Sequence, residues 1–174
     1  MKEIRGRKME KSKKILVLFG SKSDKDVYKP ILEELKRKQV NHIFRICSAH
    51  RTPDLLTEIL KEDAEHDYIC IIAGAGLAAH LPGVVASKTI KPVIGVPVYS
   101  NYSGLDAFLS IIQMPPGIPV MCVGVNKGEE AARKASLMTR QYEYVNLIGN
   151  PRDDLIAKAR KILEDYDVTI EHRT

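Results

Sequence analysis

The chain has 174 residues, of which 44% are hydrophobic and 28% are charged. These proportions are typical of a soluble globular domain, and a chain of this length can bury a core without disulfides or a structural metal. Its net charge of +5 lies entirely in residues 1–14, which contain seven Lys or Arg against two Asp or Glu. We therefore expect a solvated basic tail over residues 1–13 and no nucleic-acid partner, since no aromatic side chains interleave these charges.

The cysteines and the apolar segments exclude two further classes of protein. Cys47, Cys70 and Cys122 are far apart and form no C-x-x-C pair, which is typical of a reduced, cytoplasmic protein. The N-terminus has no apolar signal sequence, so we do not expect secretion. Residues 68–86 approach the length of a membrane span, but three glycines and a proline interrupt them, and we predict no membrane partner.

Five apolar, β-rich runs predict strands, in chain order at 14–20, 42–48, 68–74, 92–98 and 119–125. Segments with helical spacing or helix-start signals separate them. They predict helices at 25–38, after Pro53, at the end of 68–86, at 129–144 and at about 153–165. We expect all five strands to be buried on both faces, because they lack the alternation of polar and apolar residues that a half-exposed strand shows.

Strands joined by helical crossovers imply a parallel sheet that is covered on both faces. The sequence therefore predicts an α/β fold with three α/β/α layers and a C-terminal helix. We expect a single domain over residues 14–168 and a short tail over 169–174. In such sheets ligands bind at the carboxyl ends of the strands, beside the point where the strand order reverses. If the order is 2-1-3-4-5, the loops after strands one, two and three converge on one cleft.

The first of these loops reads GSKSD and lies between a strand and a helix, where backbone N–H groups attract an anion. The hydroxyls of Ser21 and Ser23 can bind phosphate oxygens. Asp24 would repel phosphate, and hydrogen bonds from ribose hydroxyls suit it better. Capping of the helix explains Ser23 and Asp24 equally well.

The second loop reads SAHRTP and follows the second strand. Helix initiation needs only Thr52 and Pro53, which leaves Ser48, His50 and Arg51 unexplained. The planar guanidinium group of Arg51 suits a phosphate, and His50 can exchange a proton near neutral pH. The alternative is a surface histidine and arginine at the end of a helix.

The third loop reads AGAGLAAHLPG. Its glycines, Gly74 and Gly76, allow a ligand to approach the backbone, and its small alanines would line a tight pocket. It is not the G-x-G-x-x-G dinucleotide motif, because position 79 is alanine. Packing of a helix against the sheet is the alternative, and a lone His80 is more often a hydrogen-bonded buried histidine than a catalyst.

The sequence predicts no metal and no organic cofactor. Its five histidines show none of the common zinc spacings, and it has no G-x-x-x-x-G-K-[ST] loop for ATP. We therefore expect the three loops to bind a small-molecule substrate without a cofactor.

The segments GSKSD, SAHRTP, AGAGLAAHLPG and GLDAFLSIIQMPPGIPV occur in this order between residues 14 and 125. In this they resemble the aminoimidazole ribonucleotide carboxylase/mutase family of purine biosynthesis. The resemblance implies a flavodoxin-like fold and a homo-octamer with sites near subunit contacts, and it places the loop 113–117 in the site region. Since AAHLPG after AGAG is of the mutase type, it implies conversion of N5-carboxyaminoimidazole ribonucleotide to its 4-carboxy isomer. It also implies a functional link to N5-carboxyaminoimidazole ribonucleotide synthase.

The resemblance assigns a role to each matching residue. His50 would be catalytic and move the proton of carbon 4, Ser48 and Arg51 would bind the phosphate, and Gly76 would shape the carboxylate pocket. His80 would organise that pocket. The full set expected to bind the substrate is Ser21, Ser23, Asp24, Ser48, Ala49, Arg51, Gly74, Ala75, Gly76, His80 and Leu81.

The sequence departs from the family pattern at two places. Leu77 stands where the family usually has glycine, and the segment 127–134 replaces one that is usually rich in small residues. Three other functions remain open at this stage: a carboxylase that uses free carbon dioxide, a related carboxylase acting on another nucleotide, and a non-enzymatic nucleotide-binding module of the same fold.

Overall fold

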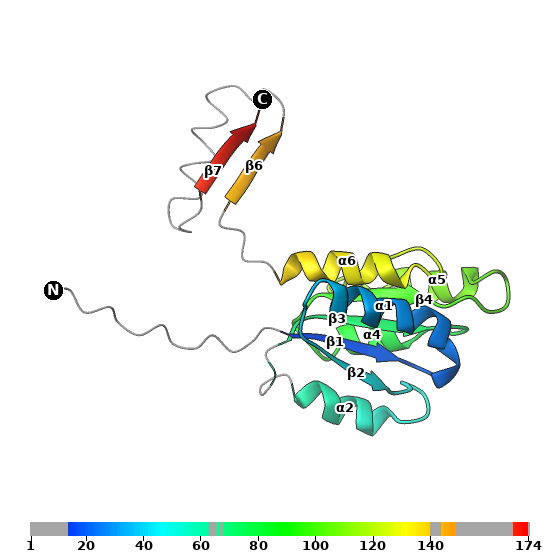
Figure 1. The fold of residues 1–174 in the computed structure, drawn as a ribbon. Coiled ribbons are helices and arrows are strands. Elements are labelled where there is room, and N and C mark those ends of the chain that lie inside the picture. Colours follow the sequence, from blue (N-terminus) through cyan, green and yellow to red (C-terminus); the bar gives the residue numbers. More distant parts are fainter. Residues whose placement is uncertain (1–13, 63–65, 67, 140–143, 149–168, 174) are drawn as a thin grey trace. The chain divides into compact units, whose positions relative to one another are not determined.

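The computed structural model describes residues 14–62, 66, 68–139, 144–148 and 169–173, and the chain divides after Thr139 into two compact units. The first unit contains a parallel five-stranded sheet with the order β2-β1-β3-β4-β5 (Figure 1). Its strands are β1 (Lys14–Phe19), β2 (His42–Ile46), β3 (Tyr68–Ala75), β4 (Val93–Pro97) and β5 (Met121–Cys122). This is the flavodoxin-like strand order, and the predicted fold class is confirmed.

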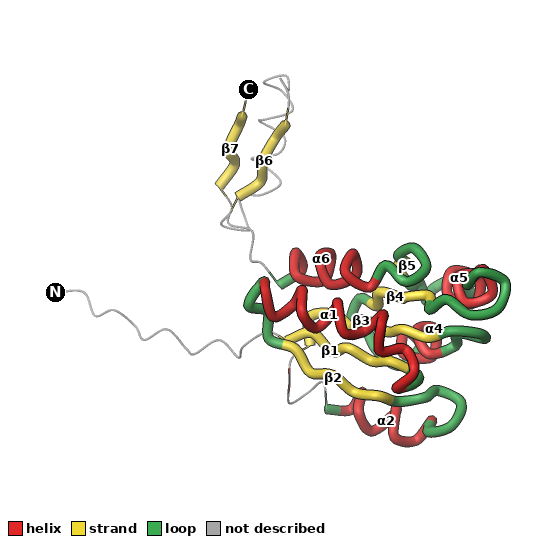
Figure 2. Tube along the Cα trace, turned by 45° about the vertical axis from the view of Figure 1, so that its right-hand side comes forward, coloured by secondary structure: helices red, strands yellow, loops and turns green. Residues whose placement is uncertain are grey.

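Helices cover both faces of this sheet, as a parallel sheet requires. In Figure 2, α1 (Lys25–Arg37) and α6 (Gly128–Met138) lie on one side of the strands, and α2 (Pro53–Lys61) and α4 (Leu81–Ala86) lie on the other. The helix α5 (Leu105–Ile112) contributes Ala107 and Ile111 to the same core cluster as α2 and α4.

The alternation of side chains along β1 explains the two separate core layers. Ile15, Val17 and Phe19 pack with residues of α1 and α6, whereas Leu16 and Leu18 pack with residues of α2, α4 and α5. All five side chains are completely buried. The strand is therefore central, and its position fixes where the loops at its carboxyl end lie.

The register of the strands places three chain segments at the same edge of the sheet. Phe19, the last residue of β1, pairs with Ile46 at the end of β2 and with Gly74 near the end of β3. The loops that follow these strands therefore begin side by side. This is the geometric condition that the sequence-based prediction of one cleft required.

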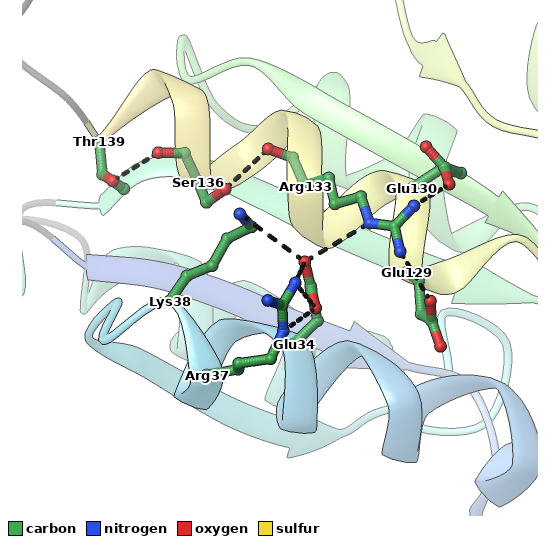
Figure 3. A network of polar contacts seen from close by, with 8 residues as sticks. All are labelled: Glu34, Arg37, Lys38, Glu129, Glu130, Arg133, Ser136 and Thr139. Carbon is green, nitrogen blue, oxygen red and sulfur yellow. Dashed lines mark hydrogen bonds and ion pairs between the residues drawn. The ribbon is translucent and has the colours of Figure 1, made fainter.

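An ion-pair network joins the two helices of one face and is drawn in Figure 3. The carboxylate of Glu34 on α1 is almost fully buried and accepts hydrogen bonds from the guanidinium group of Arg37, at 2.7–2.9 Å. Arg133 of α6 lies 3.5 Å from the same carboxylate, and Lys38 lies 3.9 Å from it. The hydrogen bonds from Arg37, together with these positive charges, lower the pKa of Glu34.

The segment 127–134, which departs from the family pattern, forms the start of α6 and packs closely on α1. Gly128 allows this approach, because a Cβ atom there would lie 2.7 Å from the backbone oxygen of Val27. Ala131, Ala132 and Ala135 are completely buried against the sheet. The small residues are therefore still present in this segment, and its charged residues, such as Glu129, point to solvent.

The structure corrects three of the predicted elements. The fifth strand is only Met121–Cys122 rather than 119–125, because Pro119 has no N–H to donate and the chain turns at Asn126, whose φ is +59°. The edge strands β2 and β5 are partly exposed rather than buried, since each has a neighbour on one side only. The helix predicted at 129–144 ends at Met138, where its buried small residues end.

The second unit contains two parallel strands, β6 (Tyr144–Ile148) and β7 (Thr169–Arg173). The sequence predicted a tail at 169–174, and the structure has a strand there. The helix predicted at about 153–165 lies outside the described residues, and the boundaries of the predicted single domain remain predictions. None of the helices in the described part of the chain is long and apolar enough to cross a membrane.

Candidate active site

A cleft of about 590 Å³ opens at the carboxyl ends of the strands. The loops after β1, β2, β3 and β4 surround it. Its lining includes eleven of the twelve residues that the sequence singled out: Ser21, Ser23, Asp24, Ser48, Ala49, His50, Arg51, Ala75, Gly76, His80 and Leu81. The structure thus brings together residues that lie up to sixty positions apart in the sequence.

The loop after β1 is organised around the hydroxyl of Ser21. Its Oγ accepts a hydrogen bond from the backbone N–H of Ser23, at 3.2 Å, and lies 2.7 Å from the Ser23 hydroxyl. Ser21 thereby caps the short 3₁₀ turn Lys22–Asp24, whereas the carboxylate of Asp24 makes no capping bond to α1. The capping alternative is therefore wrong for Asp24, whose side chain lines the cleft instead.

Asp24 is the only acidic residue among those that line the cleft. Its partial burial raises its pKa, and this effect is opposed by a hydrogen bond from Ser23, at 3.1 Å, and by the positive charge of Arg51. A carboxylate at this place accepts hydrogen bonds and repels a phosphate. It therefore suits the hydroxyl-rich part of a ligand rather than its phosphate.

The loop after β2 is closed by its own hydrogen bonds. Thr52 donates its hydroxyl proton to the backbone oxygen of Ser48, at 3.1 Å, and its Oγ1 accepts from the backbone N–H of Ser48, at 3.2 Å. Thr52 precedes α2 but makes no side-chain capping bond to it, so its hydroxyl stabilises the turn rather than the helix. His50 and Arg51 are exposed residues of this turn, and both line the cleft.

Arg51 links the first two loops. One Nη2–H of its guanidinium group donates to the backbone oxygen of Gly20, at 3.0 Å, across the ends of β1 and β2. A guanidinium group has five N–H donors in a planar fork, so this bond fixes the group and leaves further donors for an anion. Arg51 and the two serines of the first loop therefore offer donors that could bind an anion in the cleft.

Two histidines of the cleft lining contact each other. His50 Nε2 lies 2.7 Å from His80 Nδ1, and the two rings are steeply inclined at 73°. Since a hydrogen bond needs one donor and one acceptor, a single proton lies between the two nitrogens. His80 is exposed in the cleft rather than buried in the core, so the interpretation of His80 as a core histidine is wrong.

Gly74 does not line the cleft, although the sequence placed it in the binding set. A Cβ atom at this position would overlap the aromatic ring of Phe19 on β1. The absence of a side chain at Gly74 thus serves the packing of the sheet. Gly76, by contrast, lines the cleft, and a Cβ atom there would press against the backbone oxygen of Val98 at 3.3 Å.

The loop 113–117 does not reach this cleft within one chain. It follows α5, which runs back from the carboxyl edge of the sheet toward its opposite edge. There Gly117 lines a second pocket, of about 520 Å³, together with residues next to the beginnings of β4 and β5.

Sequence reasoning missed six residues of the lining: Gly20, Leu77, Ala78, Val98, Tyr99 and Ser100. The last three form the loop after β4, which lies beside β3 in the sheet. Polar residues directly after a buried strand were the available signal. Leu77 is 56% exposed and lines the cleft, so its side chain does not enter the core.

The cleft provides two histidines and no site for a metal. No group of three or more His, Cys, Asp or Glu residues in the described part of the chain could hold a metal ion. The lining offers a histidine pair that can exchange a proton, and it offers guanidinium and hydroxyl donors that could bind an anion.

A sheet of order 2-1-3-4-5 with a ligand cleft beside its switch point defines a flavodoxin-like α/β protein. Residues 14–146 match the family model described as AIR carboxylase. The chain belongs to this family.

Curated relatives and solved structures agree with this assignment. The N5-carboxyaminoimidazole ribonucleotide mutase of Methanocaldococcus jannaschii is 52% identical over 118 residues, which are 68% of this chain and 73% of the relative. The mutase of Saccharolobus solfataricus is 42% identical over 153 residues, which are 87% and 91% of the two chains. The crystal structure of Treponema denticola PurE has a TM-score of 0.63 at 26% identity and covers 88% of this chain and 96% of its own.

Proposed function

We propose that this chain is a mutase of purine biosynthesis that converts N5-carboxyaminoimidazole ribonucleotide into 4-carboxyaminoimidazole ribonucleotide. Its relatives from M. jannaschii and S. solfataricus carry the name of this activity. The observation that carries the proposal is the cleft itself, which is lined by an arginine, by serines and by a hydrogen-bonded histidine pair.

The residues that line the cleft suit the two ends of this substrate. Arg51, Ser21 and Ser48 bind the phosphate, and Asp24 accepts hydrogen bonds from the ribose hydroxyls. The imidazole ring then lies toward the loop after β3. There Gly76 and its neighbouring alanines leave room for a carboxylate, and His50 lies within reach of the ring.

The reaction moves one carboxyl group and exchanges two protons. The bond between N5 and the carboxyl carbon breaks, carbon dioxide leaves, and N5 gains a proton. Carbon 4 then attacks the carbon dioxide, a carbon–carbon bond forms, and carbon 4 loses its proton. Since one proton is taken up and one is released, a single histidine can return to its starting state in each turnover.

We assign this proton transfer to His50, held in place by His80. General acid/base catalysis by a positioned side chain typically contributes about 10²- to 10⁴-fold to the rate. The remaining acceleration requires that the cleft keeps the released carbon dioxide next to carbon 4, because a retained reactant reacts at a high effective concentration.

The test is an isomerisation assay with the wild-type protein and His50→Asn, in buffer that contains ¹³C-labelled bicarbonate. His42→Asn is the matched control, because His42 lies at the beginning of β2, outside the cleft, where its Nδ1 contacts the backbone oxygen of Val40. We expect His50→Asn to abolish isomerisation, His42→Asn to retain it, and the wild-type product to carry little label.

The same assay decides between the proposed mutase and the alternative carboxylase. A relative from Vigna aconitifolia is named phosphoribosylaminoimidazole carboxylase, and this chain covers 25% of its length at 44% identity. Efficient incorporation of the label from bicarbonate would favour that activity. Absence of any turnover in the wild-type protein would refute both enzymes and favour a nucleotide-binding module.

We further propose that the enzyme is a homo-octamer. The exposed side chains of Leu105, Leu109 and Ile112 form one apolar stripe along α5, which supports burial against other copies. The loop 113–117 lies at the opposite edge of the sheet from the cleft of its own chain. It could therefore complete a site only in a neighbouring subunit. Light scattering of the purified protein, which gives the molar mass in solution, tests this.

We also propose a place for the reaction in the cell. The enzyme would act in the cytoplasm on the route to IMP and would receive its substrate from an N5-carboxyaminoimidazole ribonucleotide synthase. If the carboxylase activity prevails, the enzyme is a lyase and needs no such supplier. Growth of a purine auxotroph that retains the synthase, compared with one that lacks it, distinguishes the two cases.

A further inference from the structure

A chain of hydrogen bonds connects α5 to the loop after β3. The hydroxyl of Ser100 lies 3.1 and 3.3 Å from the two carboxylate oxygens of Asp106 and donates to them. The same Oγ accepts a hydrogen bond from the backbone N–H of Leu77, at 3.2 Å. Ser100 lines the cleft, whereas Asp106 lies behind it in the first turn of α5.

This series of hydrogen bonds ends at Leu77, which has an unfavourable backbone conformation. Leu77 has a φ of +55°, in the left-handed region that branched L residues rarely adopt. Such a conformation persists only where the surroundings determine it, and it occurs most often at functional sites. The hydrogen bond from the Leu77 N–H to Ser100 is the contact that can hold it, since the side chain of Leu77 is more than half exposed.

The position of Leu77 bears directly on the histidine pair. The loop after β3 runs from Gly76 to His80, and the backbone N–H of His80 donates to the oxygen of Ala78, at 2.7 Å. A change in the path at Leu77 therefore moves His80, whose ring contacts His50. The guanidinium group of Arg51 is held independently of Leu77, by its hydrogen bond to the backbone oxygen of Gly20.

We infer that Asp106 is a positioning residue, which orients the Ser100 hydroxyl so that it holds Leu77 and thereby His80 in the geometry used for proton transfer. This inference rests on the proposed function. Asp106 does not line the cleft, so it acts through Ser100 and not on the substrate. An aspartate in the first turn of a helix also interacts favourably with the helix dipole, and the test must separate this general effect from positioning.

Three variants and one control provide this separation. Asp106→Ala removes the acceptor, Asp106→Asn keeps an oxygen that can accept from Ser100 but removes the charge, and Leu77→Gly removes the need for the contact, because glycine adopts a positive φ readily. The control is Ser110→Ala, since the hydroxyl of Ser110 bonds the backbone oxygen of Asp106, at 2.8 Å, and not its carboxylate.

The first measurement is hydrogen exchange at the Leu77 amide, which needs no activity. We expect exchange to be roughly tenfold faster in Asp106→Ala, within about twofold of wild type in Asp106→Asn, and unchanged in Ser110→Ala. The second is the kinetics of isomerisation. We expect Asp106→Ala to lower kcat by roughly tenfold with KM within about twofold, since small displacements of catalytic groups are costly. In the Leu77→Gly background, Asp106→Ala should have no further effect on kcat.

The outcomes separate failure of this inference from failure of the proposed function. If the wild-type protein isomerises the substrate but Asp106→Ala leaves Leu77 exchange or kcat unchanged, the inference is overturned and the function stands. If Asp106→Asn is as impaired as Asp106→Ala, the charge of the helix turn explains the effect and positioning is refuted. If the wild-type protein does not turn over, the proposed function fails, and the role in catalysis fails with it.

Discussion

Replacement of Gly74 by alanine tests whether this glycine serves packing or substrate binding. The sequence motif AGAG suggests binding, whereas the structure places the missing side chain against the ring of Phe19. Phe19 is completely buried and contacts Tyr28 edge to face, with ring centroids 5.5 Å apart. The added methyl group would overlap three carbon atoms of the Phe19 ring, so the ring or the strand must move.

The size of the effect follows from this overlap. Insertion of extra methyl groups into a well-packed core typically costs about 1–3 kcal/mol. Because a protein of this size loses about 2–4 °C in Tm per kcal/mol, we expect the Tm of Gly74→Ala to fall by roughly 2–12 °C. The cleft contains no atom of Gly74, so the KM of the folded fraction should change by less than about twofold.

The assay combines a thermal melt with steady-state kinetics well below the Tm. Gly20→Ala is the matched control for the melt, since its added Cβ would lie 3.8 Å from Ala75, an ordinary contact. Its Tm should therefore stay close to that of the wild type. A Gly74→Ala variant with an unchanged Tm and a raised KM would refute the packing interpretation and restore the role that the motif suggested.

Three further predictions concern charges and the histidine pair. Since the folded-state pKa of Glu34 is lowered from 4.5, its interactions stabilise the fold above that pH and are lost as the pH falls through the lower folded-state pKa. Thermal melts between neutral and acidic pH should therefore show a smaller loss of stability for Glu34→Gln than for the wild type. Parallel curves of Tm against pH for the two proteins would contradict this. Arg51→Lys lacks the planar fork, so substrate titrations should show a KM raised by roughly tenfold, and an unchanged KM would place the phosphate elsewhere. His80→Phe keeps a ring without its nitrogens and should lower kcat by roughly tenfold or more with little change in substrate affinity; an unchanged kcat would show that His50 acts alone.

The buried strands, and the edge of the sheet at which their loops meet, could be predicted because both follow from local patterns, whereas the order of the strands entered only as a condition. Buried runs such as 14–20 and 68–74 are recognisable one at a time, and their carboxyl ends meet at one edge in any parallel sheet. The bond between His50 and His80 could not be predicted in this way. It joins side chains thirty residues apart, and it depends on ring orientations that no pattern in either loop specifies.

Gly74 of the third motif shows what the two-residue periodicity of a strand can predict. Along β3, Cys70 and Ile72 face α1 and α6, and Gly74 continues this alternation, which directs its missing side chain toward Phe19. The signal was thus present in the sequence. It is easily overlooked, because a glycine has no side chain to show which face it occupies, and the motif as a whole suggests a ligand.

Leu77 could not be interpreted from a sequence pattern in this way. It has a positive φ, which residues other than glycine rarely adopt, and it lines the cleft. Glycine is the residue that a φ of +55° favours, and the structure nevertheless holds a leucine there, whose backbone N–H donates a hydrogen bond to Ser100 of a different loop. Conflicts between local preference and observed conformation are expected at functional sites, where the surrounding structure compensates for them. The departure of Leu77 from the family pattern therefore does not weaken the assignment of the cleft. It identifies a loop that Ser100 contacts directly and Asp106 contacts through Ser100, although both residues are more than twenty positions away in the sequence.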